Sequence, residues 1–189
     1  MSNIIFFGPP GAGKGTQANF IVNKFNLYQL STGQILRNEI KNKTELGKEI
    51  SSIINSGSLV SDEVVKKLVE NFISDQKYNN RLIFDGYPRN LTQAKTLNEL
   101  LTKYDQKINL VLKLSVSLKT IKKRILERRN IEKRADDNEE NAIKRYETYE
   151  KSTEPVIEYY KKLNLLKLIN GERSIDQINK EISDIISLI

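Results

Sequence analysis

The chain has 189 residues, of which 38% are apolar and 29% are charged, so it can bury a core and fits one globular domain. It contains no cysteine and no histidine, which excludes disulfides, thiolate chemistry, imidazole bases and zinc sites built from Cys or His. The net charge of +7 suits a polyanionic ligand, but the basic residues form no stripe interleaved with aromatic residues, so we do not predict binding to nucleic acid.

Short apolar segments alternate with longer amphipathic ones along the chain. Five segments have the pattern of strands, at residues 3–7, 28–30, 81–85, 109–114 and 165–169. The first is not a signal peptide, since no basic residue precedes it and Gly8 follows it directly, and none is long enough to cross a bilayer. We therefore predict a cytoplasmic α/β protein that does not bind membranes, with a parallel five-stranded sheet flanked by helices.

Helical periodicity is clearest over residues 61–77, where the apolar residues form one stripe. Ser61 is placed to cap this helix, and Asp62 and Glu63 favour its first turn. The spacing predicts one helix over the whole segment.

Three further features predict local structure. The sequence Ser-Ile-Asp-Gln at 174–177 is a capping box, so the last helix should begin there. Pro155 should interrupt or kink the long helical stretch around it. Lys113 lies in an otherwise apolar strand, so either its side chain reaches the edge of the sheet or the predicted register is wrong by one residue.

Residues 8–16, Gly-Pro-Pro-Gly-Ala-Gly-Lys-Gly-Thr, follow the first strand and open a helix. They match the phosphate-binding P-loop pattern G-x-x-x-x-G-K. Glycines at 8, 11 and 13 let successive backbone N–H groups turn toward phosphate oxygens, and the start of the helix adds the positive end of its dipole. Lys14 places a mobile cation over the β- and γ-phosphates. The sequence therefore predicts nucleotide binding.

Further motifs follow in chain order. They are Ser-Thr-Gly-Gln-Ile-Leu-Arg at 31–37, Gly-Ser-Leu-Val-Ser-Asp-Glu at 57–63, Asp-Gly-Tyr-Pro-Arg at 85–89 with Gln93, and Arg-Ala-Asp-Asp at 134–137. Together with the P-loop, they make the chain resemble the adenylate kinases, a family of nucleoside monophosphate kinases, in the form that has a short lid. Residues 127–137 have no room for the longer lid of many bacterial members, and without cysteine they cannot hold its zinc.

The resemblance implies an activity and a division of the chain. The activity is reversible phosphoryl transfer from ATP to AMP, giving two ADP and serving adenine nucleotide homeostasis, by a monomer that uses Mg²⁺ and no zinc. The core P-loop domain would comprise residues 1–30, 61–126 and 138–189. Residues 31–60 would form a mobile NMP-binding segment and residues 127–137 a lid, which close to exclude water when both substrates are bound.

The resemblance also implies the site residues. The ATP site would be formed by Gly11, Ala12, Gly13, Lys14, Gly15, Thr16, Arg124, Arg128 and Arg173. The AMP site would be formed by Thr32, Arg37, Ser58, Leu59, Val60, Gly86, Tyr87, Pro88, Arg89, Gln93, Arg134 and Arg145. The catalytic cations would be Lys14, Arg89, Arg128, Arg134 and Arg145.

Asp85 ends a predicted strand, at the edge where parallel sheets bind ligands. A carboxylate there can hold water molecules of a Mg²⁺ ion, and the Thr16 hydroxyl can bind the ion directly. The acceptor phosphate is already an anion, so the transfer needs no general base, which agrees with a chain that lacks histidine. Gln93 carries a donor that can pair with N1 of adenine and an acceptor that can pair with the N6 amino group.

Two other interpretations stay open at this stage. A UMP/CMP kinase would share the P-loop and the arginines but would recognise a pyrimidine. A P-loop ATP-binding switch or ATPase would need a residue that positions water and segments that switch, and neither is evident in the sequence.

Overall fold

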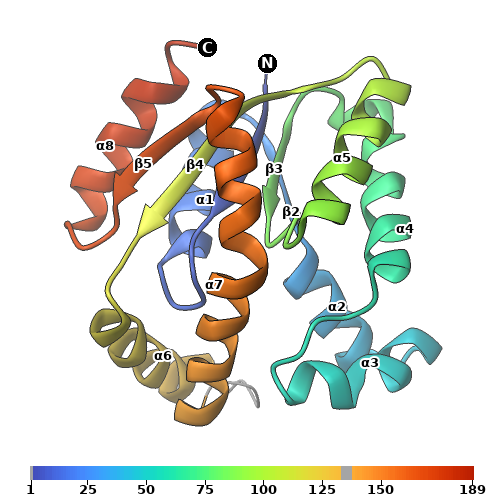
Figure 1. Cartoon of the computed structure of the whole chain (residues 1–189), viewed down its shortest axis with the longest axis vertical. Helices are drawn as coiled ribbons and strands as arrows, with labels where there is room; N and C mark the ends of the chain where they lie inside the picture. The colour runs from blue at the N-terminus through green and yellow to red at the C-terminus, as the bar shows by residue number, and fades with distance from the viewer. Residues whose placement is uncertain (1, 133–137) are drawn as a thin grey trace.

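The computed structural model describes residues 2–132 and 138–189, and in these ranges five parallel strands form one sheet in the order β2-β3-β1-β4-β5. The strands are β1 Asn3–Phe7, β2 Tyr28–Ser31, β3 Leu82–Asp85, β4 Ile108–Ser115 and β5 Leu166–Asn170. The predicted fold class and all five predicted strands are confirmed, with small differences at the strand ends (Figure 1).

Helices cover both faces of the sheet (Figure 1). They are α1 Lys14–Phe25, α2 Thr32–Lys41, α3 Glu45–Asn55, α4 Asp62–Ile73, α5 Leu91–Lys103, α6 Leu118–Glu132, α7 Glu139–Lys162 and α8 Ile175–Ile186. Helices α1 and α8 pack on one face, and α4, α5 and α7 pack on the other. None of the helices that the structure describes combines the length and the apolar composition that a membrane span requires.

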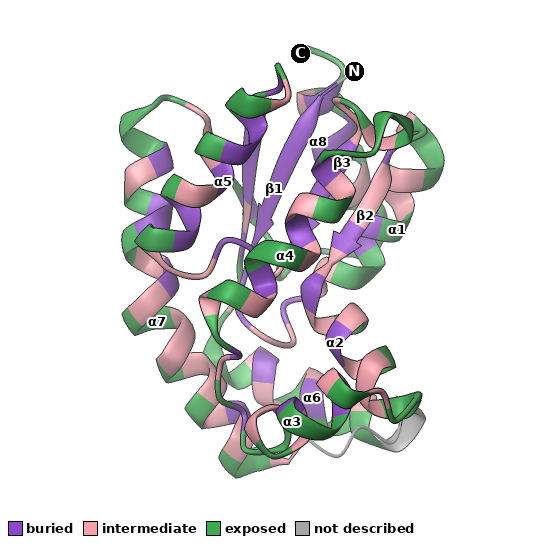
Figure 2. Ribbon diagram, turned by 90° about the vertical axis from the view of Figure 1, so that its right-hand side faces the viewer, coloured by how far each residue is buried: buried purple, intermediate pink, exposed green. Residues whose placement is uncertain are grey.

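The central strand β1 shows why both faces must be covered. Ile4 and Phe6 belong to the core beneath α1 and α8, whereas Ile5 and Phe7 belong to the core beneath α4, α5 and α7. All four are buried, because alternate side chains of a strand point to opposite faces. Figure 2 shows the buried residues along the strands and on the inner sides of the helices.

The helix predicted over residues 61–77 is shorter than expected. It ends with α4 at Ile73, and a separate 3₁₀ turn follows at Gln76–Tyr78. The reason is local, since the side chain of Asp75 accepts a hydrogen bond from the backbone N–H of Lys77 and so competes with helical hydrogen bonding. Ser61 does stand at the N-cap position, but its side chain makes no capping hydrogen bond.

Of the two effects predicted for Pro155, an interruption or a kink, the interruption does not occur. Helix α7 runs through it without a break. Tertiary contacts hold the helix on both sides of the proline: Val156 and Ile157 are fully buried, and the Thr153 hydroxyl donates to the carbonyl of Arg89 at 3.1 Å. Packing of this kind can outweigh the lost backbone hydrogen bond.

The other two local predictions have different outcomes. The capping box at Ser174 and Gln177 is present, and α8 begins directly after it. For Lys113, neither predicted alternative is right. Lys113 keeps its place in β4, paired with Leu168 of β5, and its partly buried side chain forms an ion pair with Glu154 of α7.

A buried polar network joins three segments at the amino ends of the central strands. Asn3 is fully buried; its Oδ1 accepts from the N–H of Leu82 at 3.0 Å, and its Nδ2 donates to Oε1 of Gln106 at 3.0 Å. Gln106 in turn donates to the carbonyl of Ile73 at 3.0 Å. Each bond satisfies a group that burial would otherwise penalise.

Substitution of Asn3 by leucine, which has a similar volume, should lower the free energy of unfolding by about 2–4 kcal/mol, because it leaves the buried Leu82 N–H unpaired and removes the hydrogen bond to Gln106. Urea denaturation measures the change. Asn71→Leu on the exposed side of α4 is the control and should change stability by less than about 0.5 kcal/mol. An Asn3→Leu protein as stable as the unmodified one would contradict the role given to this network.

Candidate active site

A cleft of about 740 Å³ opens at the carboxyl ends of the strands. Its walls come from the P-loop, the start of α2, the loop before α4, the turn after β3, and α6 and α7. All the site residues predicted within the described ranges line this cleft, with the exception of Tyr87. Tyr87 is a core residue that is 1% exposed and whose hydroxyl donates to the carbonyl of Gln93. Arg134 lies outside the described residues.

The P-loop takes the shape that its glycines predict. Gly11 and Gly13 have φ angles of 81° and 97°, in the left-handed region that a side chain disfavours. Gly13 is the N-cap of α1, so the first backbone N–H groups of that helix face the cleft. These features together form an anion site at the end of β1.

Lys14 is held in the cleft by backbone carbonyls. Its Nζ donates to the carbonyl of Gly8 at 2.6 Å and to that of Pro9 at 3.1 Å. Burial lowers the pKa of Lys14 to about 8; Asp85 acts in the opposite direction, while nearby arginines lower the pKa further. The amine is thus a cation that the protein holds at some electrostatic cost.

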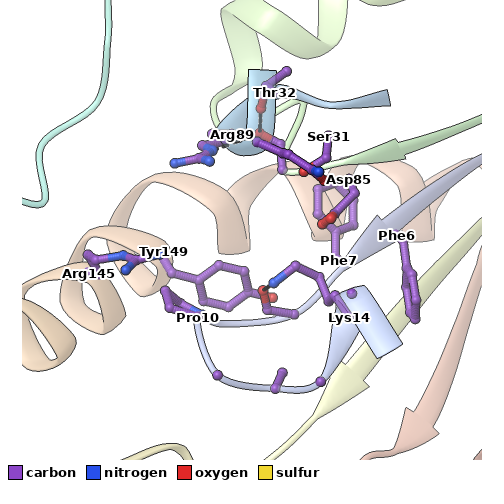
Figure 3. Close-up of a pocket in the computed structure, with 18 of the residues that line it drawn as sticks. Phe6, Phe7, Pro10, Lys14, Ser31, Thr32, Asp85, Arg89, Arg145 and Tyr149 are labelled. Carbon is purple, nitrogen blue, oxygen red and sulfur yellow. Dashed lines mark hydrogen bonds between the residues drawn. The ribbon is translucent and has the colours of Figure 1, made fainter. Parts of the chain in front are cut away.

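Arg89 is held in the same way. Its Nε donates to the carbonyl of Gly86 at 2.7 Å, and that carbonyl also accepts from the hydroxyl of Thr32 at 3.0 Å (Figure 3). Burial, followed by the proximity of Arg145, lowers the pKa of Arg89 to about 10. The guanidinium still carries its charge at neutral pH.

Positive charge dominates the lining of the cleft. Among the described lining residues, the acidic ones are Asp85 and Glu127. The basic ones are Lys14, Arg37, Arg89, Arg124, Arg128, Arg145 and Arg173. A cleft with this excess of cations is suited to a polyanion that extends from the P-loop toward α2.

Two predicted ATP-site arginines are engaged by the protein itself. The guanidinium of Arg124 donates to the carbonyl of Ala12 at 2.9 Å and to that of Gly171 at 3.0 Å. It therefore joins the P-loop to the turn after β5. Arg173 lines the cleft and forms an ion pair with Glu181 of α8.

Asp85 and Thr16, the predicted Mg²⁺ residues, both line the cleft. Oδ2 of Asp85 accepts from Nε2 of Gln29 at 2.9 Å. The carboxylate is 9% exposed, and it raises the pKa of Lys14, so it lies within electrostatic range of the phosphate-binding lysine. A carboxylate and a hydroxyl beside a P-loop are the hard oxygen ligands that Mg²⁺ prefers, so these residues fit the ion.

The sequence reasoning missed the contribution of α7 beyond Arg145. Tyr149 lies one turn further along that helix, and Figure 3 shows its ring projecting into the cleft toward Lys14. Its buried hydroxyl makes no hydrogen bond within the described residues, and burial raises its pKa. The spacing of four residues from Arg145 was the available signal, because such residues share a helix face.

The fold and the cleft define a class of enzyme. A P-loop at the end of β1, continued by a second arginine-lined site beside α2, is the arrangement of a P-loop nucleoside monophosphate kinase, in which two nucleotides meet at their phosphates.

Comparisons with known proteins agree with this class. The family model for adenylate kinase matches residues 6–165. An adenylate kinase of Pelagibacter ubique is 44% identical over 98% of this chain and 100% of its own length. Adenylate kinases of Fusobacterium nucleatum and Flavobacterium psychrophilum are 41% and 40% identical, and the alignments cover 97% and 99% of this chain and 98% and 99% of theirs.

The chain belongs to the adenylate kinase family, and it is a phosphotransferase. These relatives give no support to the alternatives of a UMP/CMP kinase or an ATPase switch.

The lowered pKa of Lys14 predicts a pH dependence. Below about pH 8 the amine is protonated, and as the pH rises through that value the free enzyme loses the cation. Because kcat/KM for the P-loop nucleotide reports on the free enzyme, we expect it to fall as the pH rises through about 8. Bound phosphates raise the pKa of the lysine again, so kcat should persist to higher pH.

Steady-state kinetics between pH 7 and 9 measure this profile. As an internal control, kcat/KM for the second nucleotide at saturating P-loop nucleotide should stay level over the same range. A level profile for the P-loop nucleotide would show that Lys14 does not titrate in the free enzyme.

Proposed function

We propose that the protein catalyses ATP + AMP ⇌ 2 ADP, with ATP at the P-loop end of the cleft and AMP at the end formed by α2. The observation that carries this proposal is the cleft in which Arg89 and Arg145 lie close enough to Lys14 to lower its pKa, and Arg145 lies close enough to Arg89 to lower that of Arg89. A cationic centre between two nucleotide sites is where the transferred phosphoryl group would lie.

The transfer would be direct and in line, without a covalent intermediate on the enzyme. The attacking phosphate oxygen of AMP is already anionic, so no base has to remove a proton. Catalysis then consists of positioning the two phosphates and neutralising the charge of the transition state. Lys14 would exchange the carbonyls of Gly8 and Pro9 for phosphate oxygens.

The roles of the remaining residues follow from their places in the cleft. Arg128 would bind ATP, and Arg37, Arg89 and Arg145 would bind the AMP phosphate with paired hydrogen bonds. Arg134 would bridge both phosphate chains from the lid.

The division into a core, an NMP-binding segment of residues 31–60 and a lid of residues 127–137 stays a prediction. Of that lid, residues 127–132 are described, and they continue α6.

Mg²⁺ would be held by the Thr16 hydroxyl and, through water, by Asp85. The ion would neutralise charge on the β- and γ-phosphates. Gln29 would keep the Asp85 carboxylate turned toward this position through its hydrogen bond to Oδ2.

The AMP base would lie against Thr32 and Gln93, both of which are nearly fully buried. The Gln93 amide can donate to N1 of adenine and accept from N6.

Family membership further suggests a cytoplasmic monomer that binds no nucleic acid, and these points too remain proposals.

Incubation of the protein with ADP and Mg²⁺ alone tests the reaction, because a kinase of this type produces equal amounts of ATP and AMP from ADP. Chromatography of the nucleotides measures the products. In the forward direction, kcat/KM for UMP and CMP should be lower than for AMP by at least about 10²-fold, because a pyrimidine does not pair with both the N–H and the lone pair that the Gln93 amide presents to the base. Equal efficiency with UMP or CMP would overturn the substrate assignment.

Lys14→Met should lower kcat by about 10³-fold or more while the protein remains folded, because the substitution removes a cation that acts on transition-state charge. Circular dichroism checks the fold, and the coupled assay gives kcat. Lys24→Met, at the far end of α1, is the matched control and should keep normal activity. A Lys14→Met variant with raised KM for ATP but normal kcat would limit Lys14 to ground-state binding.

A further inference from the structure

The Gln93 side chain, which lines the cleft, is held at both ends of its amide by the protein. Nε2 donates to Oδ1 of Asp62 at 2.7 Å. Oε1 accepts from the backbone N–H of Arg89 at 2.7 Å. Gln93 is 4% exposed, so bulk water offers little competition for these two bonds.

These two partners fix which end of the amide points where. The oxygen and nitrogen ends of an amide have nearly the same shape, so their hydrogen-bond partners decide the orientation. A carboxylate only accepts hydrogen bonds, and a backbone N–H only donates them. Turning the Gln93 amide over would place oxygen against the Asp62 carboxylate and NH₂ against the Arg89 N–H. Both contacts would be repulsive, so one orientation is strongly preferred.

Asp62 is itself held in place behind the cleft wall. Both of its carboxylate oxygens accept from Nδ2 of Asn90, at 3.1 and 3.2 Å. Asn90 also accepts from the backbone N–H of Gln93 at 2.8 Å. Asp62 is the first residue of α4, where the helix dipole favours negative charge. It is not among the residues that line the cleft, and its hydrogen bond to Gln93 is its direct connection to one that is.

The amide still has one N–H and one lone pair for a ligand. Adenine offers an acceptor at N1 and a donor at N6, which match that pair. A 6-oxopurine such as hypoxanthine or guanine offers a donor at N1 and an acceptor at O6, the reverse arrangement. Because the monophosphate anchors one end of the ligand, a reversed base cannot simply turn over to recover both hydrogen bonds.

We propose that Asp62 is a positioning residue that sets base specificity, by locking the Gln93 amide in the orientation that accepts adenine and rejects 6-oxopurine monophosphates. This inference rests on the proposed function, in which Gln93 contacts the base of AMP. The role of Asp62 adds to that function a reason for discrimination between purines of the same size.

The test compares kcat/KM for AMP and for IMP, whose base has the size of adenine with an oxo group in place of the 6-amino group. The unmodified protein should prefer AMP by at least about 10²-fold. Asp62→Asn keeps the shape of the side chain, but its carboxamide can either donate or accept, so one of the two constraints on Gln93 disappears. We expect the AMP/IMP preference to fall by about tenfold or more, through KM for the monophosphates, with KM for ATP unchanged.

Glu63→Gln is the matched control, because it removes an exposed carboxylate from the same helical turn without touching Gln93. It should leave the AMP/IMP preference unchanged.

Asp62→Ser, whose hydroxyl also donates or accepts, provides a second variant if Asp62→Asn fails to fold. A double-mutant cycle with Gln93→Ala separates a specific role from general destabilisation, because the Asp62 substitution should have no further effect on the preference once the amide is absent.

An AMP/IMP preference that survives in the folded Asp62 variants would overturn the inference. So would an equal change in the Gln93→Ala background. The underlying assignment has its own readout, since an unmodified protein that does not favour AMP over UMP and CMP would fail the proposed function before any Asp62 variant is compared.

Discussion

The whole site depends on holding several partly buried cations together in one cleft. Like charges repel, and burial removes the hydration that would screen them, so the arrangement is costly without an anion. The lowered pKa values of Lys14 and Arg89 express that cost directly. The protein holds both side chains with backbone carbonyls, those of Gly8, Pro9 and Gly86. Carbonyls fix the positions of the cations without neutralising them, so their attraction for phosphate is retained.

The fold supplies these carbonyls from two neighbouring loops, the P-loop after β1 and the turn after β3. Strands β1 and β3 are adjacent and parallel, with Phe6 paired to Asp85, so the P-loop and the Asp85–Arg89 turn leave the sheet side by side. Helix α7 completes the centre from the opposite wall. Its Arg145 and Tyr149 line the cleft, and its Thr153 donates to the carbonyl of Arg89. The parallel sheet is therefore the reason that residues far apart in sequence meet at one point.

Much of this arrangement could be predicted from the sequence because local patterns carry it. Alternation of strands and helices gave the sheet, and the glycines with Lys14 gave the phosphate site. The failures occurred where distant contacts decide. Buried neighbours carry α7 through Pro155, and Glu154 of the same helix forms an ion pair with Lys113 of β4. The family motif includes Tyr87, but a motif does not distinguish a residue that faces the ligand from one that packs beneath it.

The Gln93 amide illustrates the same limit at the scale of single atoms. Its residue type indicates that it can pair with adenine, but it does not reveal which end of the amide faces which part of the base. That choice is made by Asp62, 31 residues away in sequence, and by a backbone N–H of Arg89. An amide fixed before the ligand arrives loses little rotational freedom on binding, so more of its hydrogen-bond energy remains available for affinity and selectivity. The same rule governs the cations, since Lys14 and Arg89 are also held in place by the protein rather than by the ligand.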